Sequence, residues 1–221
     1  LTKSPHQKVL VEKPKENEID FEAEYVLSNE GVLNGEMNVE LQNASNPYLK
    51  IIRKKWQAKT LLSSDIPASD IKFNIVTSDP EETNIKYKIK EEQELEKRAD
   101  YFFFELPVMK EGIEGFSIHE LSSVRNTPLK LKYAIDDKYE YEIELSYRLE
   151  PANPEVKIEE KTSIGEVSIV IKTKANKINV SRSIEIYKDN ISLQHYQDFR
   201  KLMNLWNDKN YRQLVIITLA N

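Results

Sequence analysis

The sequence predicts a mainly β protein made of two antiparallel, sandwich-like units, each covered by one amphipathic helix. Apolar and polar residues alternate in many short segments, which is the pattern of half-buried strands. Only two segments, near 46–62 and 192–206, have helical spacing. Turn-forming residues separate the alternating segments. The alternative layout is an antiparallel sheet covered by a single helix.

We expect residues 1–16 to be a linker or an edge strand, 17–120 to be a first β-rich domain, and 121–221 to be a second. Residues 1–16 contain two prolines and show no sustained period, which is typical of a connecting segment. The sequence begins at Leu1 and shows no basic and apolar leader, so we expect a fragment of a longer protein.

The first domain opens with a predicted β-hairpin. Residues 19–25 and 37–41 both alternate between apolar and polar side chains, and the segment between them contains Gly31 and Gly35. Ser45-Asn46-Pro47 then predicts a helix start, because Ser or Asn can cap a helix and Pro is tolerated in its first turn. Further alternating or apolar strands are expected at 71–75, 85–89 and 101–108, before a connection at 109–128.

The second domain continues the same pattern of short strands. Residues 139–145 alternate strictly, and 167–171 and 178–186 form a predicted hairpin around the turn "KANK" at 174–177. Shorter strands are expected at 129–133 and 156–158, and a last one at 214–219.

The helix near 192–206 has one apolar face, which we interpret as a structural lid over the core. The residues on this face are Tyr196, Phe199, Leu202, Met203 and Trp206. Polar side chains such as Asp198, Arg200 and Asn204 fall mainly on the opposite side. Burial of the apolar face would make this helix part of the fold and not a mobile element.

Composition excludes several classes of function. The net charge is −5, with acidic and basic residues interleaved, which argues against a nucleic-acid partner. No apolar run approaches the roughly 20 residues that a membrane-spanning helix needs. The chain has no cysteine, which excludes disulfides, zinc-thiolate sites and a cysteine nucleophile within it. The oligomeric state is left open.

The candidate catalytic and metal-binding residues do not assemble into a motif. His195 could be a general base, but no nucleophile motif accompanies it, so we interpret it as structural. A metal site would need His195 to meet His6 and His119, which lie in unrelated segments. Ser63, Ser64 and Ser163 lack a G-x-S-x-G context. We therefore predict that the chain has no catalytic residue, binds no cofactor or metal, and is not an enzyme.

Three other features have simple structural interpretations. Arg53-Lys54-Lys55 beside Trp56 is expected to be the polar face of the first helix and not a phosphate site. Phe102 to Phe104 is expected to be core. An acidic group lacks the spacing and the glycine of a calcium loop; it comprises Glu91, Glu92, Glu94, Glu96 and Asp100.

Several segments together resemble the C-terminal, β-rich domains of unknown function in exported, multidomain bacterial proteins of the transglutaminase-like family. The segments are "FELP", "SSVRNTPLKLKY" with Arg125 and Pro128, "KYEYEIEL", "VSRSIEIYKDNIS" and "YQDFRKLMNLWNDKNYRQLVI". The resemblance is loose over 17–221 and closer over 100–221. The segment "LSYRLEP" departs from it, because the family usually has a proline-glycine turn there.

The resemblance implies a non-catalytic accessory region that is periplasmic or extracellular in a Gram-negative bacterium. In that family the chemistry belongs to a Cys-His-Asp triad in a papain-like core, and no such residue can be carried over to this cysteine-free chain. The implied partner is the parent catalytic core or its protein substrate. The alternative function is a carbohydrate-binding β-sandwich module, which the tyrosine and tryptophan content on a β scaffold would suit. An enzyme in its own right would need clustered titratable groups in a cleft.

Overall fold

The computed structural model describes residues 17–42, 61–63, 66–78, 82–89, 93–116, 118 and 121–219. The protein is mainly β, as the sequence predicts, and the described residues contain one α-helix, α3 (Tyr196–Trp206). The helix expected at 46–62 and the segment 1–16 lie outside the described residues, apart from the end of that helix, where Leu62 starts a short strand. No helix of the described part is long and apolar enough to cross a bilayer.

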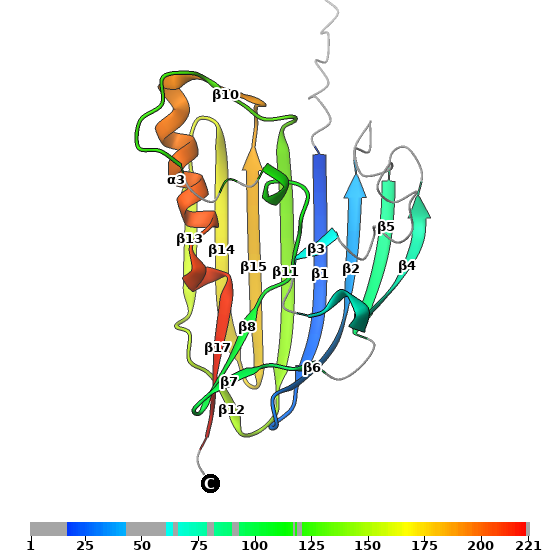
Figure 1. Ribbon diagram of the computed structural model, residues 1–221. Coiled ribbons are helices and arrows are strands. Elements are labelled where there is room, and N and C mark those ends of the chain that lie inside the picture. The colour runs from blue at the N-terminus through cyan, green and yellow to red at the C-terminus, as the bar shows by residue number, and fades with distance from the viewer. Residues whose placement is uncertain are drawn as a thin grey trace, which may run out of the picture.

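A large nine-stranded sheet forms the main layer of the molecule (Figure 1). Its strands in spatial order are β13 (Val156–Lys161), β14 (Gly165–Lys174), β15 (Lys177–Ile186), β11 (Ile135–Leu145), β1 (Asn17–Leu27), β2 (Val32–Gln42), β5 (Glu82–Ile89) and β4 (Ile71–Ser78), and β6 (Gln93–Glu94) also pairs with β2. All neighbouring pairs are antiparallel except β1 and β11, which run parallel from Asn17 beside Ile135 to Leu27 beside Leu145.

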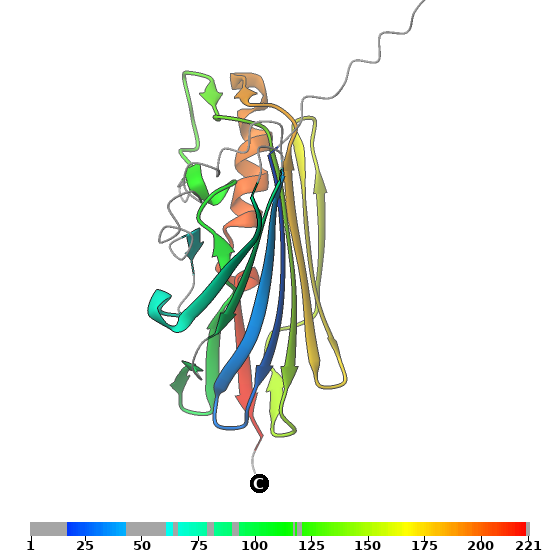
Figure 2. The same cartoon turned by 90° about the vertical axis from the view of Figure 1, so that its right-hand side faces the viewer.

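A second layer covers one face of this sheet (Figure 2). It consists of α3 and a four-stranded sheet in the order β12 (Leu149–Pro151), β17 (Gln213–Thr218), β8 (Tyr101–Glu105) and β7 (Glu96–Arg98). Two short pairs complete the layer: β10 (Leu129–Lys130) with β16 (Asn190–Ile191), and β3 (Leu62–Ser63) with β9 (Val108–Met109). The short 3₁₀ turns are η2 (Ala68–Asp70), η3 (Glu114–Phe116), η4 (Leu193–His195) and η5 (Lys209–Tyr211).

The alternation in the sequence explains which side of each strand faces the second layer. In β1 the odd-numbered residues from Ile19 to Leu27 are buried, and the residues between them are half-buried or exposed. Aromatic side chains dominate the centre of the core, where the ring of Phe21 lies 5.4 Å from that of Tyr139 and 5.5 Å from that of Tyr141. The second layer contributes Phe104, whose ring meets that of Tyr25 edge-on at 5.2 Å.

Both hairpins expected from the sequence are present. Strands β1 and β2 pair from Glu18 beside Gln42 to Leu27 beside Leu33, and Gly31 in their turn has a φ of +84°. Strands β14 and β15 pair across the turn at 174–177, where Ala175 has a φ of +54°. Local turn chemistry thus fixes these two antiparallel pairings.

The strands of the two expected units are not separated into two sandwiches. Strand β1 of the first unit and β11 of the second lie side by side at the centre of one sheet. The arrangement is closer to the alternative layout, because one sheet carries one described helix on its face. Strands from both sides of this position in the sequence belong to one sheet, and a domain boundary between residues 120 and 121 stays a prediction.

Candidate interaction surface

The face of the large sheet opposite to α3 carries no second layer among the described residues (Figure 2). The three central strands display on it a set of acidic side chains that we call the carboxylate stripe. Its members are Glu18, Asp20, Glu22 and Glu24 on β1, Glu36 and Glu40 on β2, and Asp136, Glu140, Glu142 and Glu144 on β11. They all come from positions that alternate with buried residues, so the strand geometry places them on one side.

Acidic residues of the stripe lie directly beside one another across the strands. Between β1 and β11 the neighbouring pairs are Glu18 with Asp136, Glu22 with Glu140, and Glu24 with Glu142. Between β1 and β2 they are Asp20 with Glu40 and Glu24 with Glu36. Strands in a sheet are about 4.8 Å apart, and like charges directly opposite each other are destabilising. The stripe therefore opposes the stability of the sheet.

Lys138 is the one basic residue that β1, β2 and β11 place on this face. Its Nζ lies 2.9 Å from Glu18 Oε1 and 3.5 Å from Asp136 Oδ2. Partial burial alone would lower the pKa of Lys138, but the hydrogen bond to Glu18 and the nearby carboxylates of Asp136 and Asp20 raise it above its ordinary value. This lysine thus remains protonated at neutral pH and offsets part of the negative charge around it.

The carboxyl groups near Lys138 still have raised pKa values. Partial burial is the main cause for both Asp20 and Asp136, and Lys138 opposes it in each case. The charge of Glu18 raises the pKa of both groups further. For these two groups burial, together with the charge of Glu18, therefore outweighs the opposing effect of Lys138.

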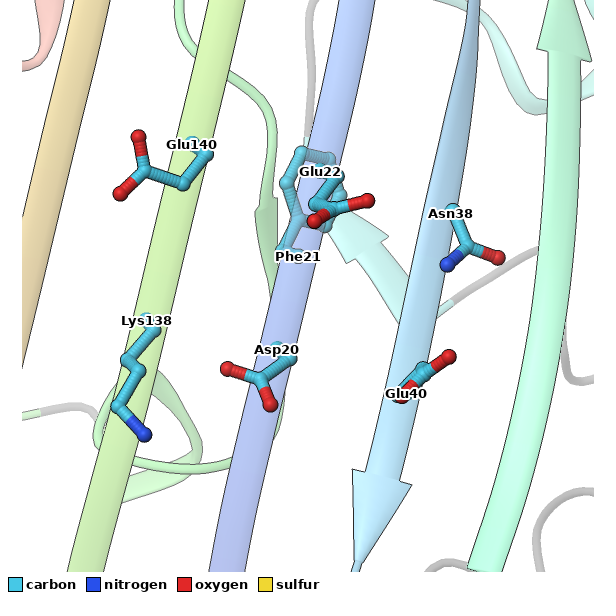
Figure 3. Close-up of a pocket in the computed structure, with 7 residues that line it drawn as sticks. All are labelled: Asp20, Phe21, Glu22, Asn38, Glu40, Lys138 and Glu140. Carbon is cyan, nitrogen blue, oxygen red and sulfur yellow. The ribbon is translucent and has the colours of Figure 1, made fainter.

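A shallow pocket of about 280 Å³ lies in the middle of the stripe (Figure 3). Its lining residues are Asp20, Phe21, Glu22, Asn38, Glu40, Lys138 and Glu140. The polar side chains project from β1, β2 and β11 toward the viewer, whereas Phe21 lies behind β1, on the core side of the sheet. The buried Oδ1 atom of Asn38 has no hydrogen-bond partner within the described part of the protein.

Several members of the stripe have partners on neighbouring strands, and Ser181 on β15 donates a 2.7 Å hydrogen bond to Glu140. Glu36 pairs with Lys88 on β5, Glu40 accepts a 2.9 Å hydrogen bond from Asn84 Nδ2, and Glu142 lies 2.5 Å from Lys177 Nζ on β15. By contrast, neither Glu22 nor Glu24 forms a hydrogen bond or an ion pair with a described residue. Glu24 is still within electrostatic reach of Lys177, so Glu22 is the one of the two that is open to an external cation.

A second group of polar residues lies at the other side of the molecule, where α3 ends. A pocket of about 600 Å³ is lined there by Ser63, Glu105, Glu114, Asn207, Lys209, Arg212 and Gln213. Arg212 lies between the carboxylates of Glu114, at 3.3 Å, and Glu105, at 3.9 Å, and Glu114 also accepts a 2.9 Å hydrogen bond from Trp206 Nε1. The charges of this pocket are thus paired with one another, although the buried Nε of Arg212 has no hydrogen-bond partner in the described part of the protein.

His195 belongs to a surface cluster with Ser163 and Asp198. Ser163 Oγ lies 3.1 Å from His195 Nδ1 and donates a 3.2 Å hydrogen bond to Asp198 Oδ2, which itself lies 3.8 Å from the same ring nitrogen. In a hydrolytic triad the imidazole stands between serine and aspartate and uses a different ring nitrogen for each. Here both residues approach Nδ1, so the cluster has the geometry of a polar cap and not of a proton relay.

The five residues of the expected lid are all buried, and α3 packs on the large sheet beside β14. Phe102 and Phe104 are also buried, and Phe103 is half-buried. Ser63 lies at the rim of the larger pocket. Several residues considered from the sequence lie outside the described residues: His6, Arg53, Lys54, Lys55, Trp56, Ser64, Glu91, Glu92 and His119. Within the described residues no three potential metal ligands lie close enough together to hold a metal ion.

Sequence reasoning missed the carboxylate stripe although its signal was present. Residues 18–24 and 140–144 alternate acidic with apolar residues, and this alternation was used only to predict strands. The acidic residues of each strand had to share a face, but their accumulation depends on β1 and β11 being neighbours. A pairing between strands so far apart in the chain has no local turn signal.

The fold and this surface define a mainly β domain with an open, acidic sheet face. Residues 100–216 match the family described as "Domain of Unknown Function with solved-structure structure (DUF3858)", and this is more than half of the chain. The chain therefore belongs to the DUF3858 family. No curated protein sequence matches it significantly.

The chain is also similar in fold to a solved structure. That crystal structure is described as "a putative protease" from Parabacteroides distasonis, and the match has a TM-score of 0.50 and 22% sequence identity. It covers 54% of this chain and 24% of the other, so about half of this chain matches about a quarter of that protein. At this level of identity the likeness shows a shared fold.

Proposed function

We propose that the chain is a non-catalytic accessory region of a larger, transglutaminase-like protein and that it acts by contact with the catalytic core or with the protein substrate of that core. The open carboxylate stripe carries this proposal, because it keeps like charges in register at a cost to stability and leaves Glu22 without a partner among the described residues. The likeness to part of a larger protein that is described as a protease supports the same context.

The arrangement of the described titratable groups supports a role in contact more than a role in chemistry. The Ser163 cluster lacks the relay geometry of a triad, and the charges around Glu114 are paired internally. A catalytic acid or base needs a group that can exchange a proton with a bound substrate. We also propose a location in the periplasm or outside the cell, which fractionation of cells expressing the full-length gene would test.

The proposal is tested by expressing this chain and the papain-like core of the full-length gene separately. We expect isothermal titration calorimetry to show saturable association between them, and we expect the chain alone to give no turnover of protein substrates. If the two parts do not associate and the chain does not bind the protein substrate of the core, the accessory role is wrong. Saturable turnover by the purified chain would also contradict it.

A carbohydrate-binding role is the second candidate, and an exposed aromatic ring is what it requires. Tyr147, in the turn between β11 and β12, is 78% exposed and is the most accessible aromatic residue of the described part. A glycan panel with the wild type and Tyr147→Ala discriminates between the two roles. Binding of several sugars by the wild type and loss of this binding in Tyr147→Ala would favour the carbohydrate role.

A further inference from the structure

We infer that the carboxylate stripe binds an extended protein segment in which lysine or arginine occupies every second position. This inference rests on the proposed contact function and adds the chemistry of the partner. The occupant is a cationic polypeptide because the three central strands present their acidic side chains with Lys138 as the sole basic residue of those strands on this face.

The spacing of the stripe matches that of an extended chain. Along β1 the acidic residues Glu18, Asp20, Glu22 and Glu24 occur at every second position, and residues two apart on a strand are separated by about 6.6 Å. An extended segment that lies along β1 presents alternate side chains toward the sheet at the same interval. Each of its cations would therefore meet a new carboxylate.

The sideways pairing of acidic residues matches the size of a single cation. Glu22 lies beside Glu140, and Glu24 lies beside Glu142, on strands that are about 4.8 Å apart. One guanidinium or ammonium group placed between such a pair can reach both carboxylates. Arginine can in addition donate two parallel N–H hydrogen bonds to the two oxygens of one carboxylate. The binding of such a segment would remove the like-charge repulsion that the free sheet carries.

Lysines border the stripe on both sides and so determine the direction of the bound segment. Lys86 and Lys88 on β5 flank it beyond β2, and Lys177 on β15 flanks it beyond β11. A cationic segment that crossed the strands would approach these lysines, whereas one that lies along β1 and β11 stays over the acidic residues. A narrow, extended segment therefore fits this face better than a broad basic surface.

A metal ion does not fit the same residues. A calcium ion needs six to eight oxygen ligands at about 2.3–2.6 Å, which must converge on one point. The carboxylates of the stripe project in parallel from a sheet, and no three of the potential ligands in the described residues form a cluster that could hold a metal. Separate cations at regular intervals satisfy this geometry.

The test uses a labelled twelve-residue peptide that alternates lysine and threonine, and fluorescence anisotropy with the whole chain at fixed salt. We compare the wild type with the triple variant Glu22→Gln, Glu24→Gln, Glu140→Gln. The matched control is Glu96→Gln, Asp100→Asn, Glu150→Gln, which removes the same charge from exposed positions in the second layer. We expect the stripe variant to lose about tenfold in affinity and the control to keep most of it.

Two further measurements make the outcome decisive. A peptide of the same composition, with all lysines in one block, should bind more weakly than the alternating one, and equal binding of the two would overturn the inference. Equal losses in the stripe variant and the control would overturn it as well, since they would indicate attraction by net charge alone. Urea unfolding of both variants checks that they are folded.

Failure of this inference can be separated from failure of the proposed function. If the stripe variant still associates with the separately expressed core and the wild type does not bind the alternating peptide, the accessory role stands and the partner chemistry is wrong. If the peptide binds through the stripe but the core and its substrate do not associate with the chain, the proposed context is wrong and the surface assignment stands.

Discussion

The guanidinium of Arg182 lies over the indole ring of Trp206, 4.3 Å from its centroid, and donates a 2.6 Å hydrogen bond from Nη2 to the backbone carbonyl of the same tryptophan. Arg182 is in β15 of the large sheet, and Trp206 is the last residue of α3. Both side chains are buried. The cation therefore lies at the negative end of the helix dipole and joins the lid to the sheet.

We predict that Arg182→Lys destabilises the protein by about 2 kcal/mol, because an ammonium group cannot stack on the indole and bond the carbonyl from the same position. Urea unfolding measures the loss. The control is Arg148→Lys, since Arg148 stacks on the exposed ring of Tyr147 at 5.5 Å and its replacement should change stability by less than about 0.5 kcal/mol. Equal effects at the two sites would contradict the role of burial.

Phe199 and Asn204 provide a test of the lid on a single helix. Phe199 is fully buried, so Phe199→Ala should destabilise the protein by about 3–5 kcal/mol through lost burial and the cavity that remains. Asn204 is on the exposed side of α3, and Asn204→Ala should be within about 0.5 kcal/mol of the wild type. If Phe199→Ala unfolds at the same urea concentration as Asn204→Ala, α3 does not stabilise the core.

Gly31 is needed for the turn between β1 and β2. Its φ is +84°, and a Cβ atom at this position would lie 2.1 Å from the ring of Phe102. Gly31→Ala should therefore cost about 2 kcal/mol or more in thermal or urea unfolding, from backbone strain and overpacking together. Gly115→Ala is the control, because the nearest atom to its added Cβ would be 3.1 Å away and its φ is not positive. A loss in Gly115→Ala as large as that in Gly31→Ala would contradict this account.

The alternation of apolar residues was sufficient to predict the longer strands and the side of each that is buried, but not short strands such as β6, β7 and β12. It was also sufficient for the two hairpins, since a turn links the paired strands directly. The parallel pairing of β1 and β11 could not be predicted, because more than 100 residues separate Leu27 from Ile135 and every strand with a buried face is an equal candidate neighbour. This pairing unites the two expected units in one sheet.

Two buried polar residues also follow the alternation of their strands. Arg182 occupies a core position between Val180 and Ile184, and Asp137 occupies one between Ile135 and Tyr139. Both positions share the spacing of the buried apolar residues beside them, but the partners of these side chains come from elsewhere in the chain. The backbone carbonyl of Trp206 accepts a hydrogen bond from Arg182, and the backbone N–H of Ile113 donates a 2.7 Å hydrogen bond to Asp137. Such partners are fixed by the tertiary fold.

Asp137 should make stability depend on pH. Burial raises its pKa well above the ordinary value, although the hydrogen bond from Ile113 opposes this. A group with a raised pKa in the folded state stabilises the protein below its unfolded pKa, and this contribution is lost as the pH rises through the folded pKa. Asp137→Asn should therefore be closest to the wild type near about pH 4 and gain in relative stability as the pH rises.

Urea unfolding across this pH range measures the effect of Asp137→Asn. Glu150→Gln, at an exposed position of β12, is the control for the removal of one carboxylate. A profile in Asp137→Asn that runs parallel to that of the wild type would contradict the assignment of a raised pKa to Asp137.

Substitution of Glu22 should raise the stability of the protein, whereas most substitutions lower it. It lies beside Glu140 across β1 and β11 and has no partner among the described residues, so Glu22→Gln should stabilise the protein by about 0.5 kcal/mol at low salt. The gain should shrink in about 1 M salt, where charges are screened within roughly 3 Å. Urea midpoints at the two salt concentrations measure it, with Glu150→Gln as the control.

A stabilising substitution within the stripe would mean that its charges are not kept for the fold, as expected if they serve a partner. Destabilisation by Glu22→Gln at low salt would remove the like-charge argument on which the interaction surface rests.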